Sequence, residues 1–268
     1  MEAIGALEAD KGVRLVIFWP VCPVLLGFSA HFSERVWQMG RYTLGHAKPA
    51  FVNMTNAINL AGLLRAETKS LHAAAERAGI MSAFLRGQID RKIYCRLLRN
   101  FVEIYAALEA ALELHAAQPA LKALRFPALK RCVALRGDLQ FLHGKNWAAE
   151  ISLANSGAHY VERIDWISTH DPELLIAHTY VRYLGDLSGG QMLRNIVGSA
   201  LQLQGEAGIG FYIFDAPGAS ALAASYRQRL QDIEVNAGLA ARVVEEAQSA
   251  FRRHVDLFEE LAATPPFT

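Results

Sequence analysis

From about Asn59 onward, apolar side chains recur at every third or fourth position, the spacing that places them on one face of an α-helix. The first such helix starts near Leu60, and Gly79 is expected to end it. Asp90 has the character of an N-cap and starts a second helix. Further helices are expected at about 129–142, 158–168, 172–203, 219–235 and 239–261. Residues 211–214 (FYIF) are expected to form a short extended piece. The alternation typical of strands is absent, so the sequence predicts an all-α, multi-helix bundle.

The first 56 residues lack this helical periodicity. Within them, residues 13–28 are strongly apolar, but the stretch is shorter than the roughly 20 residues of a membrane-spanning helix, and Pro20 and Pro23 interrupt it. The acidic residues near the start are unlike a basic signal or transit leader. We therefore expect residues 1–56 to be an N-terminal extension, either a targeting segment or, as we favour, the result of an over-long start-codon assignment. Residues 57–264 are expected to form one helical domain.

The charge and the cysteines narrow the function classes. Positive and negative side chains nearly balance, with a formal net charge of +1, so a broad basic face for nucleic acid is not expected. Cys22, Cys95 and Cys132 are far apart and form no CxxC pair. Scattered cysteines of this kind are typical of free thiols in a reducing compartment, and not of a disulfide framework or a thiolate metal site. We therefore expect a cytoplasmic protein.

The segment 180–198 (YVRYLGDLSGGQMLRNIVG) contains three glycines inside an otherwise helical pattern, Gly185, Gly189 and Gly190. Each glycine in a helix interior costs about 1 kcal/mol relative to alanine, so the three together cost roughly 3 kcal/mol. Two requirements for a bare backbone are consistent with this pattern: close packing against another helix, or a flat ligand that lies on a kinked helix. The glycines alone leave both open.

Leu187 to Gln191 spell LSGGQ, which is also the signature of ABC-transporter ATPases. Those ATPases need a GxxxxGK[ST] phosphate loop on a strand–loop–helix unit, and this sequence has neither, so an ATPase is excluded. Arg182 and Asp186 lie four residues apart beside the glycines. Such a pair is either an ordinary surface ion pair, worth about 0.3–0.5 kcal/mol, or an anchor for ordered water in a ligand pocket.

His72 shares a helix face with Arg65, Thr68 and Glu76. This face offers an imidazole for a metal, a carboxylate that can orient the imidazole, and a cation for an acidic ligand. The chain has 9 histidines, however, and a lone histidine on an amphipathic helix is more often a surface or core residue than a metal ligand. Spacing alone therefore does not select His72.

Six segments together resemble the haem oxygenases of the biliverdin-forming type. They are LRAETKSLHAAAE (64–76), GQIDRKIYCRLLRNFVEIYAALEAAL (87–112), FLHGKNW (141–147), PELLIAHTYVRYLGDLSGGQ (172–191), SYRQRL (225–230) and VVEEAQSAF (243–251). The likeness runs in order over about residues 60–261. Any one segment is weak evidence, but the six in this order are specific.

The resemblance implies a role for each matching residue around a bound haem. His72 matches the proximal haem ligand, and Glu76 matches the carboxylate that orients this ligand. Gly185, Gly189 and Gly190 match the glycines of the distal helix, whose backbone covers the other face of the haem. The implied reason for the costly glycines is that a side chain there would block the porphyrin or the O2.

The polar residues implied to hold water near the reacting oxygen are Tyr105, Tyr180, Arg182 and Asp186. Among them, Asp186 is implied to deliver a proton through water. Arg65 and Arg227 match cations that pair with the haem propionates, and Phe251 matches an aromatic residue that packs near the haem. Relatives often carry a lysine four residues before Arg227, where this chain has Ala223, so its clamp on the propionates differs.

The resemblance thus implies a haem oxygenase domain at 57–264 that uses O2 and external electrons to cleave haem to biliverdin, Fe2+ and CO. Haem is then both cofactor and substrate, and the protein supplies position, protons and the exclusion of water. The electrons are expected from a ferredoxin or a flavoprotein reductase. We expect cleavage at the alpha meso carbon and a monomer. Since the C-terminal LAATPPFT has no hydrophobic tail, we expect no stable membrane anchor.

Two rival functions come from other classes. The first is a haem carrier or sensor of the same fold without turnover, and the polar set around Asp186 argues against it, because binding alone needs no proton relay. The second is a related helical enzyme with a different substrate, such as the thiaminase-like proteins. Those proteins lack the proximal histidine and the distal glycines together.

Overall fold

A computed structural model describes residues 58–264, and within this range the chain is helical, with no strand. The predicted extension at 1–56, its apolar stretch and Cys22 lie outside the described residues. The elements, in chain order, are α1 (Leu60–Arg77), α2 (Gly79–Leu85), α3 (Arg91–Leu114), α4 (Pro119–Ala123), the 3-10 turn η1 (Pro127–Leu129), α5 (Cys132–Leu142), α6 (Trp147–Glu150), α7 (Asn155–His170), η2 (Pro172–Leu174), α8 (Leu175–Ser188), α9 (Gly190–Ala200), η3 (Gly210–Tyr212), α10 (Ala219–Gln231) and α11 (Ala237–Ala263). The all-α prediction is confirmed.

Side-chain caps fix the starts of the long helices. Asp90 accepts a hydrogen bond from the backbone N–H of Ile93 at 2.9 Å, as its position in the sequence predicts. Asn59 caps α1 through the N–H of Gly62 at 2.8 Å, and Asn236 caps α11 in the same way. These caps satisfy N–H groups that a helix start otherwise leaves without an acceptor.

Two predicted details are wrong. The single helix predicted at 172–203 is η2, α8 and α9, with a junction at Gly189, and α9 ends at Ala200. Residues 210–212 form the 3-10 turn η3 and not an extended piece. The first helix ends at Arg77, and Gly79 follows its C-cap with φ +40° and begins α2, so the predicted end is confirmed. An added Cβ at Gly79 would lie 2.0 Å from the carbonyl oxygen of Phe258, so only glycine allows α11 to approach this closely.

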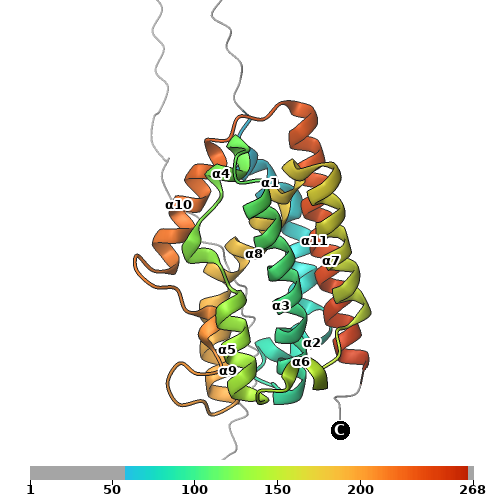
Figure 1. Cartoon of the computed structure of the whole chain (residues 1–268), viewed down its shortest axis with the longest axis vertical. Helices are drawn as coiled ribbons and strands as arrows, with labels where there is room; N and C mark the ends of the chain where they lie inside the picture. The colour runs from blue at the N-terminus through green and yellow to red at the C-terminus, as the bar shows by residue number, and fades with distance from the viewer. Residues whose placement is uncertain (1–57, 265–268) are drawn as a thin grey trace, which may run out of the picture. The chain divides into compact units, whose positions relative to one another are not determined.

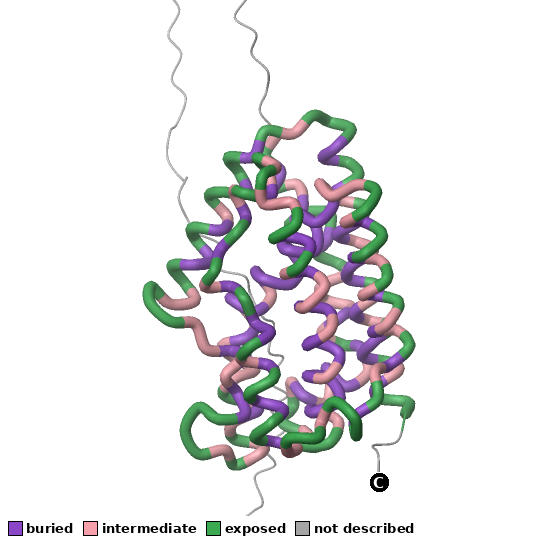
Figure 2. Tube along the Cα trace, viewed as in Figure 1, coloured by how far each residue is buried: buried purple, intermediate pink, exposed green. Residues whose placement is uncertain are grey.

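The last helix is the centre of the packing. Within the described residues, α11 packs against α1, α2, α7 and α8, and α3 packs against α5, α7 and α8 (Figure 1). Buried positions line the inner faces of the long helices and exposed ones their outer faces (Figure 2). The largest side chains of this core are aromatic: Tyr94, Tyr105, Tyr160, Tyr226, Phe84 and Phe211. In residues 58–264, no helix combines the length and the apolar character needed to cross a membrane.

Candidate functional site

The face of α1 predicted from the sequence is formed as expected. Thr68 is buried, whereas the imidazole of His72 is 36% exposed. The Nδ1 atom of His72 lies 3.5 Å from the carboxylate of Glu76, and its ring packs edge-on against Phe251 of α11 at 5.8 Å. A proton on Nδ1 that faces Glu76 leaves the lone pair on Nε2, which is the form of imidazole that binds a metal.

The polar residues of α8 form a buried cluster with Tyr105 of α3. The Tyr105 hydroxyl donates to Asp186, and Arg182 donates from Nε to the Tyr105 hydroxyl at 3.0 Å and from Nη2 to Asp186 at 3.1 Å. All three side chains are buried. The Arg182–Asp186 pair is therefore not an exposed surface ion pair. Burial raises the pKa of Asp186, although the charge of Arg182 opposes this. A carboxyl group with a raised pKa suits proton transfer near neutral pH.

His254 is a member of this cluster that the sequence analysis missed. Its Nε2 accepts from Nη1 of Arg182 at 2.7 Å, and its Nδ1 therefore carries the proton and donates to the carbonyl of Ala250 at 2.8 Å. The ring of Phe101 lies 4.2 Å below the Arg182 guanidinium. The position of His254, three residues after Phe251 on the same helix, is the signal that would have pointed to it.

Tyr180, Arg65 and Arg227 lie apart from the Asp186 cluster. The Tyr180 hydroxyl is 3.5 Å from the Thr68 hydroxyl and so joins α8 to α1. Burial and the nearby charge of Arg65 lower the pKa of Arg227, whose Nη2 donates to Ser188 at 3.3 Å. Two guanidinium groups this close repel each other, which favours an anion beside them.

The three glycines of this segment have different surroundings in the structure. An added Cβ at Gly185 would meet no heavy atom within 4 Å, and one at Gly189 would meet only the carbonyl oxygen of Gly185, at 3.5 Å. At Gly190 it would lie 3.3 Å from the ring of Tyr212 in η3. Gly185 and Gly189 therefore border open space, whereas Gly190 packs closely against Tyr212, so close packing accounts for Gly190 alone.

Comparisons with known proteins decide the family. Residues 58–260 match the family model described as "Heme oxygenase". The chain belongs to the haem oxygenase family. It is 42% identical to heme oxygenase 1 of Nostoc sp. over 204 residues, which cover 76% of this chain and 86% of that protein. It is 39% identical to heme oxygenase 1 of Gallus gallus over 207 residues, covering 76% and 70%.

Solved haem oxygenase structures share the fold. The crystal structure of Synechocystis heme oxygenase-1 in complex with heme matches with a TM-score of 0.72 and 38% identity, over 76% of this chain and 92% of that one. Synechocystis heme oxygenase-2 in complex with heme and NO matches with a TM-score of 0.74 and 39% identity, over 76% and 85%. Both of those structures are haem complexes, so haem is the group that the residues of this haem oxygenase should fit.

The residues present fit the group. At Gly185 and Gly189 no side chain stands between the α8–α9 backbone and a ligand, and an added Cβ would meet no side chain within 4 Å. His72 supplies an imidazole nitrogen, Phe251 an apolar wall, and Arg65 and Arg227 supply cations for carboxylates. Ala223 is buried and adds no charge to this end of the site, so the cations there are arginines.

Proposed function

We propose that this chain cleaves haem to biliverdin, Fe2+ and CO with O2 and external electrons, through the residues of the site described above. The observation that carries the proposal is the placement of Asp186, whose buried carboxyl has a raised pKa and directly follows Gly185, the glycine that borders open space. A haem carrier needs the space but not the acid. The acid therefore favours turnover over storage.

His72 and Glu76 are proposed to hold the iron from α1. Haem, when bound, supplies the redox chemistry and the activation of O2. The carboxylate of Glu76 keeps the proton on Nδ1 of His72, so that Nε2 faces the metal as a neutral ligand. Phe251 limits the rotation of the imidazole from the other side.

Arg65 and Arg227 are proposed to pair with the two propionates and so to set how the ring lies in the site. Burial and the charge of Arg65 lower the pKa of Arg227. Propionates beside the two guanidinium groups would offset this repulsion. Tyr180 lies beside both cations and ties this end of the site to Thr68 on α1. Gly185 and Gly189 keep side chains away from the ring, and Gly190 allows the start of α9 to pack closely against Tyr212.

Asp186 is proposed to hold a proton and pass it through water toward the reacting oxygen. Arg182 and Tyr105 fix the orientation of its carboxyl group by hydrogen bonds, and burial keeps bulk water from exchanging freely with it. Burial raises the pKa of Asp186 and so favours the protonated form that this role needs.

The domain bounds, electron donor, location and oligomeric state are proposed from membership of the haem oxygenase family. A domain of residues 57–264 is supported by the matched range 58–260 and by the described fold. We propose a ferredoxin or a flavoprotein reductase as electron donor and a cytoplasmic location. We also propose a monomer.

A single-turnover absorbance experiment tests the proposal. The purified chain receives one equivalent of haemin, then reductant and air, with catalase present to remove peroxide. We expect loss of the Soret band and growth of a red biliverdin band in the wild type, but not in His72→Ala. The matched control is His159→Ala, which removes an exposed histidine from α7. A Soret band that survives reduction and O2 would mean a carrier, and no Soret band at all would refute haem binding.

A further inference from the structure

The turn η3 is anchored by two charged side chains from the start and the middle of α5. The carboxylate of Asp138 accepts the backbone N–H of Gly210 at 2.8 Å and that of Phe211 at 2.7 Å. Arg131 donates from Nη1 to the carbonyl of Ile213 at 2.7 Å. Asp138 is only 3% exposed, and this anchor has no part in the proposed handling of haem.

The turn η3 packs against two parts of the candidate site, Tyr105 and the start of α9. The ring of Phe211 lies 5.7 Å from that of Tyr105, which donates to Asp186. The ring of Tyr212 is the group that a Cβ on Gly190 would meet at 3.3 Å, and the Tyr212 carbonyl accepts from Gln191 of α9 at 2.8 Å. A movement of η3 would therefore displace both Tyr105 and the start of α9.

We propose that Asp138 is a positioning residue of the reaction: its carboxylate fixes η3, and η3 sets the positions of Tyr105 and of the Gly190 end of the distal helix. The proposal rests on the proposed function. A carboxylate suits this task because its two oxygens accept two neighbouring N–H groups at once. An asparagine of the same size would offer one oxygen and turn an NH2 group toward the second donor.

The anchor is expected to depend on pH. Burial raises the pKa of Asp138 to about 6, although the hydrogen bonds from Phe211 and Gly210 oppose the rise. The titratable groups that face the carboxylate are Tyr94 of α3 and Tyr212 of η3, and both stay neutral in this range. As the pH falls through about 6, Asp138 gains a proton and one of its oxygens becomes a donor, so the hold on η3 weakens.

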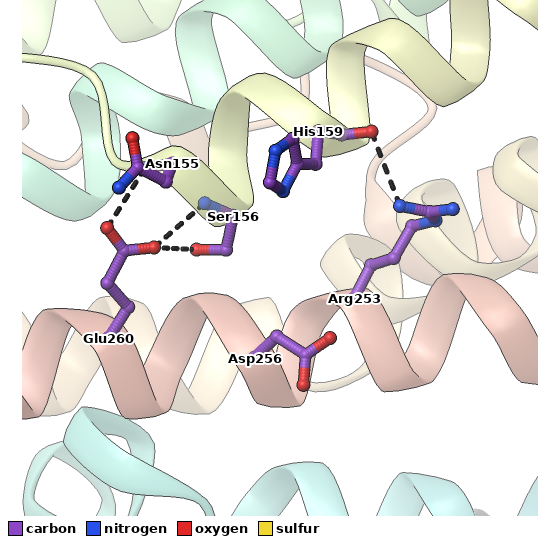
Figure 3. A pocket seen from close by; sticks show the side chains of 6 residues that line it. All are labelled: Asn155, Ser156, His159, Arg253, Asp256 and Glu260. Atoms are coloured by element: carbon purple, nitrogen blue, oxygen red, sulfur yellow. Dashed lines mark hydrogen bonds between the residues drawn. The ribbon is translucent and has the colours of Figure 1, made fainter.

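The first test uses the wild-type protein without haem. The amide 1H and 15N shifts of Gly210 and Phe211 should titrate together with a midpoint near 6, and those of the Asn155 and Ser156 amides should not share this midpoint. The latter pair donates to Glu260, whose carboxylate accepts two N–H groups in the same way at the start of α7 (Figure 3). Gly210 and Phe211 amides that stay constant between pH 4.5 and 7.5 (a range of about one and a half units either side of the midpoint) would overturn the anchor.

The second test compares single-turnover rates of Asp138→Asn, Glu260→Gln and the wild type. We expect one haem per chain in all three, but biliverdin formation slower by roughly 10- to 100-fold in Asp138→Asn alone. The wild-type rate should fall at acid pH with the midpoint of the Gly210 and Phe211 amides, which tests the role even if Asp138→Asn does not fold. An Asp138→Asn rate equal to that of the wild type overturns the role of Asp138 only. A wild type that forms no biliverdin overturns the proposed function as well.

Discussion

Replacing Gly185 by alanine should stabilise the free protein while it damages the site. Gly185 lies inside α8, and its added Cβ would meet no heavy atom within 4 Å. No clash then offsets the better helix propensity of alanine, which is worth about 1 kcal/mol. For a domain of about 200 residues, 1 kcal/mol raises the melting temperature by about 2–4 °C. In a haem-binding site, however, the same methyl group occupies the space proposed for the ring.

The control for this prediction is Gly137→Ala. Gly137 is also inside a helix, α5, and its added Cβ would also meet no heavy atom within 4 Å, but it is exposed and outside the candidate site. Both variants should gain about 1 kcal/mol in the ligand-free protein. Only Gly185→Ala should bind haem more weakly or turn it over more slowly, by roughly tenfold or more, since a 1.4 kcal/mol steric penalty already gives a factor of ten.

Thermal unfolding without haem, haemin titration and single turnover measure the three quantities. The reasoning is refuted if Gly185→Ala lowers the melting temperature while Gly137→Ala raises it, because the space beside Gly185 would then not be open. It is also refuted if Gly185→Ala binds and cleaves haem as Gly137→Ala does. In that case the glycine would not be kept for the ligand.

Three further predictions concern residues around the site and the core. His254→Ala leaves Nη1 of the buried Arg182 without its acceptor, so urea unfolding should show a loss of about 1–3 kcal/mol with haem binding retained; an unchanged midpoint would contradict this. Burial alone would raise the pKa of Glu246, but hydrogen bonds from neighbouring side chains lower it from 4.5 to about 2. The folded protein should therefore lose about 3 kcal/mol as the pH falls from about 5 to about 2, and Glu246→Gln should flatten that slope in acid titrations. Gly157→Ala places a Cβ 1.9 Å from the amide oxygen of the buried Asn100, so it should destabilise the fold by about 3 kcal/mol or more in the same unfolding assay, and a loss below about 1 kcal/mol would show that Asn100 can move aside.

The sequence located the long helices because their apolar period repeats over several turns and their caps are readable. Asp90 and the apolar run after it were sufficient to place α3. The short helices α2, α4 and α6 were not predicted, since segments of 7, 5 and 4 residues span two turns or fewer and show no clear period. The break at Gly189 was also missed, because its backbone angles stay helical and only the hydrogen-bond pattern changes.

For the site, the sequence was informative where partners lie one turn apart. The pairs His72–Glu76 and Arg182–Asp186 follow from a spacing of four on a helix. Contacts such as Tyr105–Asp186, which are 81 residues apart, depend on how helices pack and entered only through the family resemblance. Asp138 carried no local signal, since a single buried aspartate looks like any other until its partners are known. His254 had only its place three residues after Phe251 to point to it.

The pairing of the first helix with the last has a consequence for synthesis. Gln248 of α11 donates to the carbonyl of Glu67 of α1, 181 residues earlier, and the side chain of Glu259 binds the N–H of Gly79. At about 5–20 residues per second, a ribosome needs roughly 10–40 s to make the intervening chain. During that time the apolar stripe of α1 has no α11 to cover it. We therefore expect chaperones to bind the nascent chain through this uncovered apolar stripe. Truncation before α11 should give a product that aggregates and does not fold.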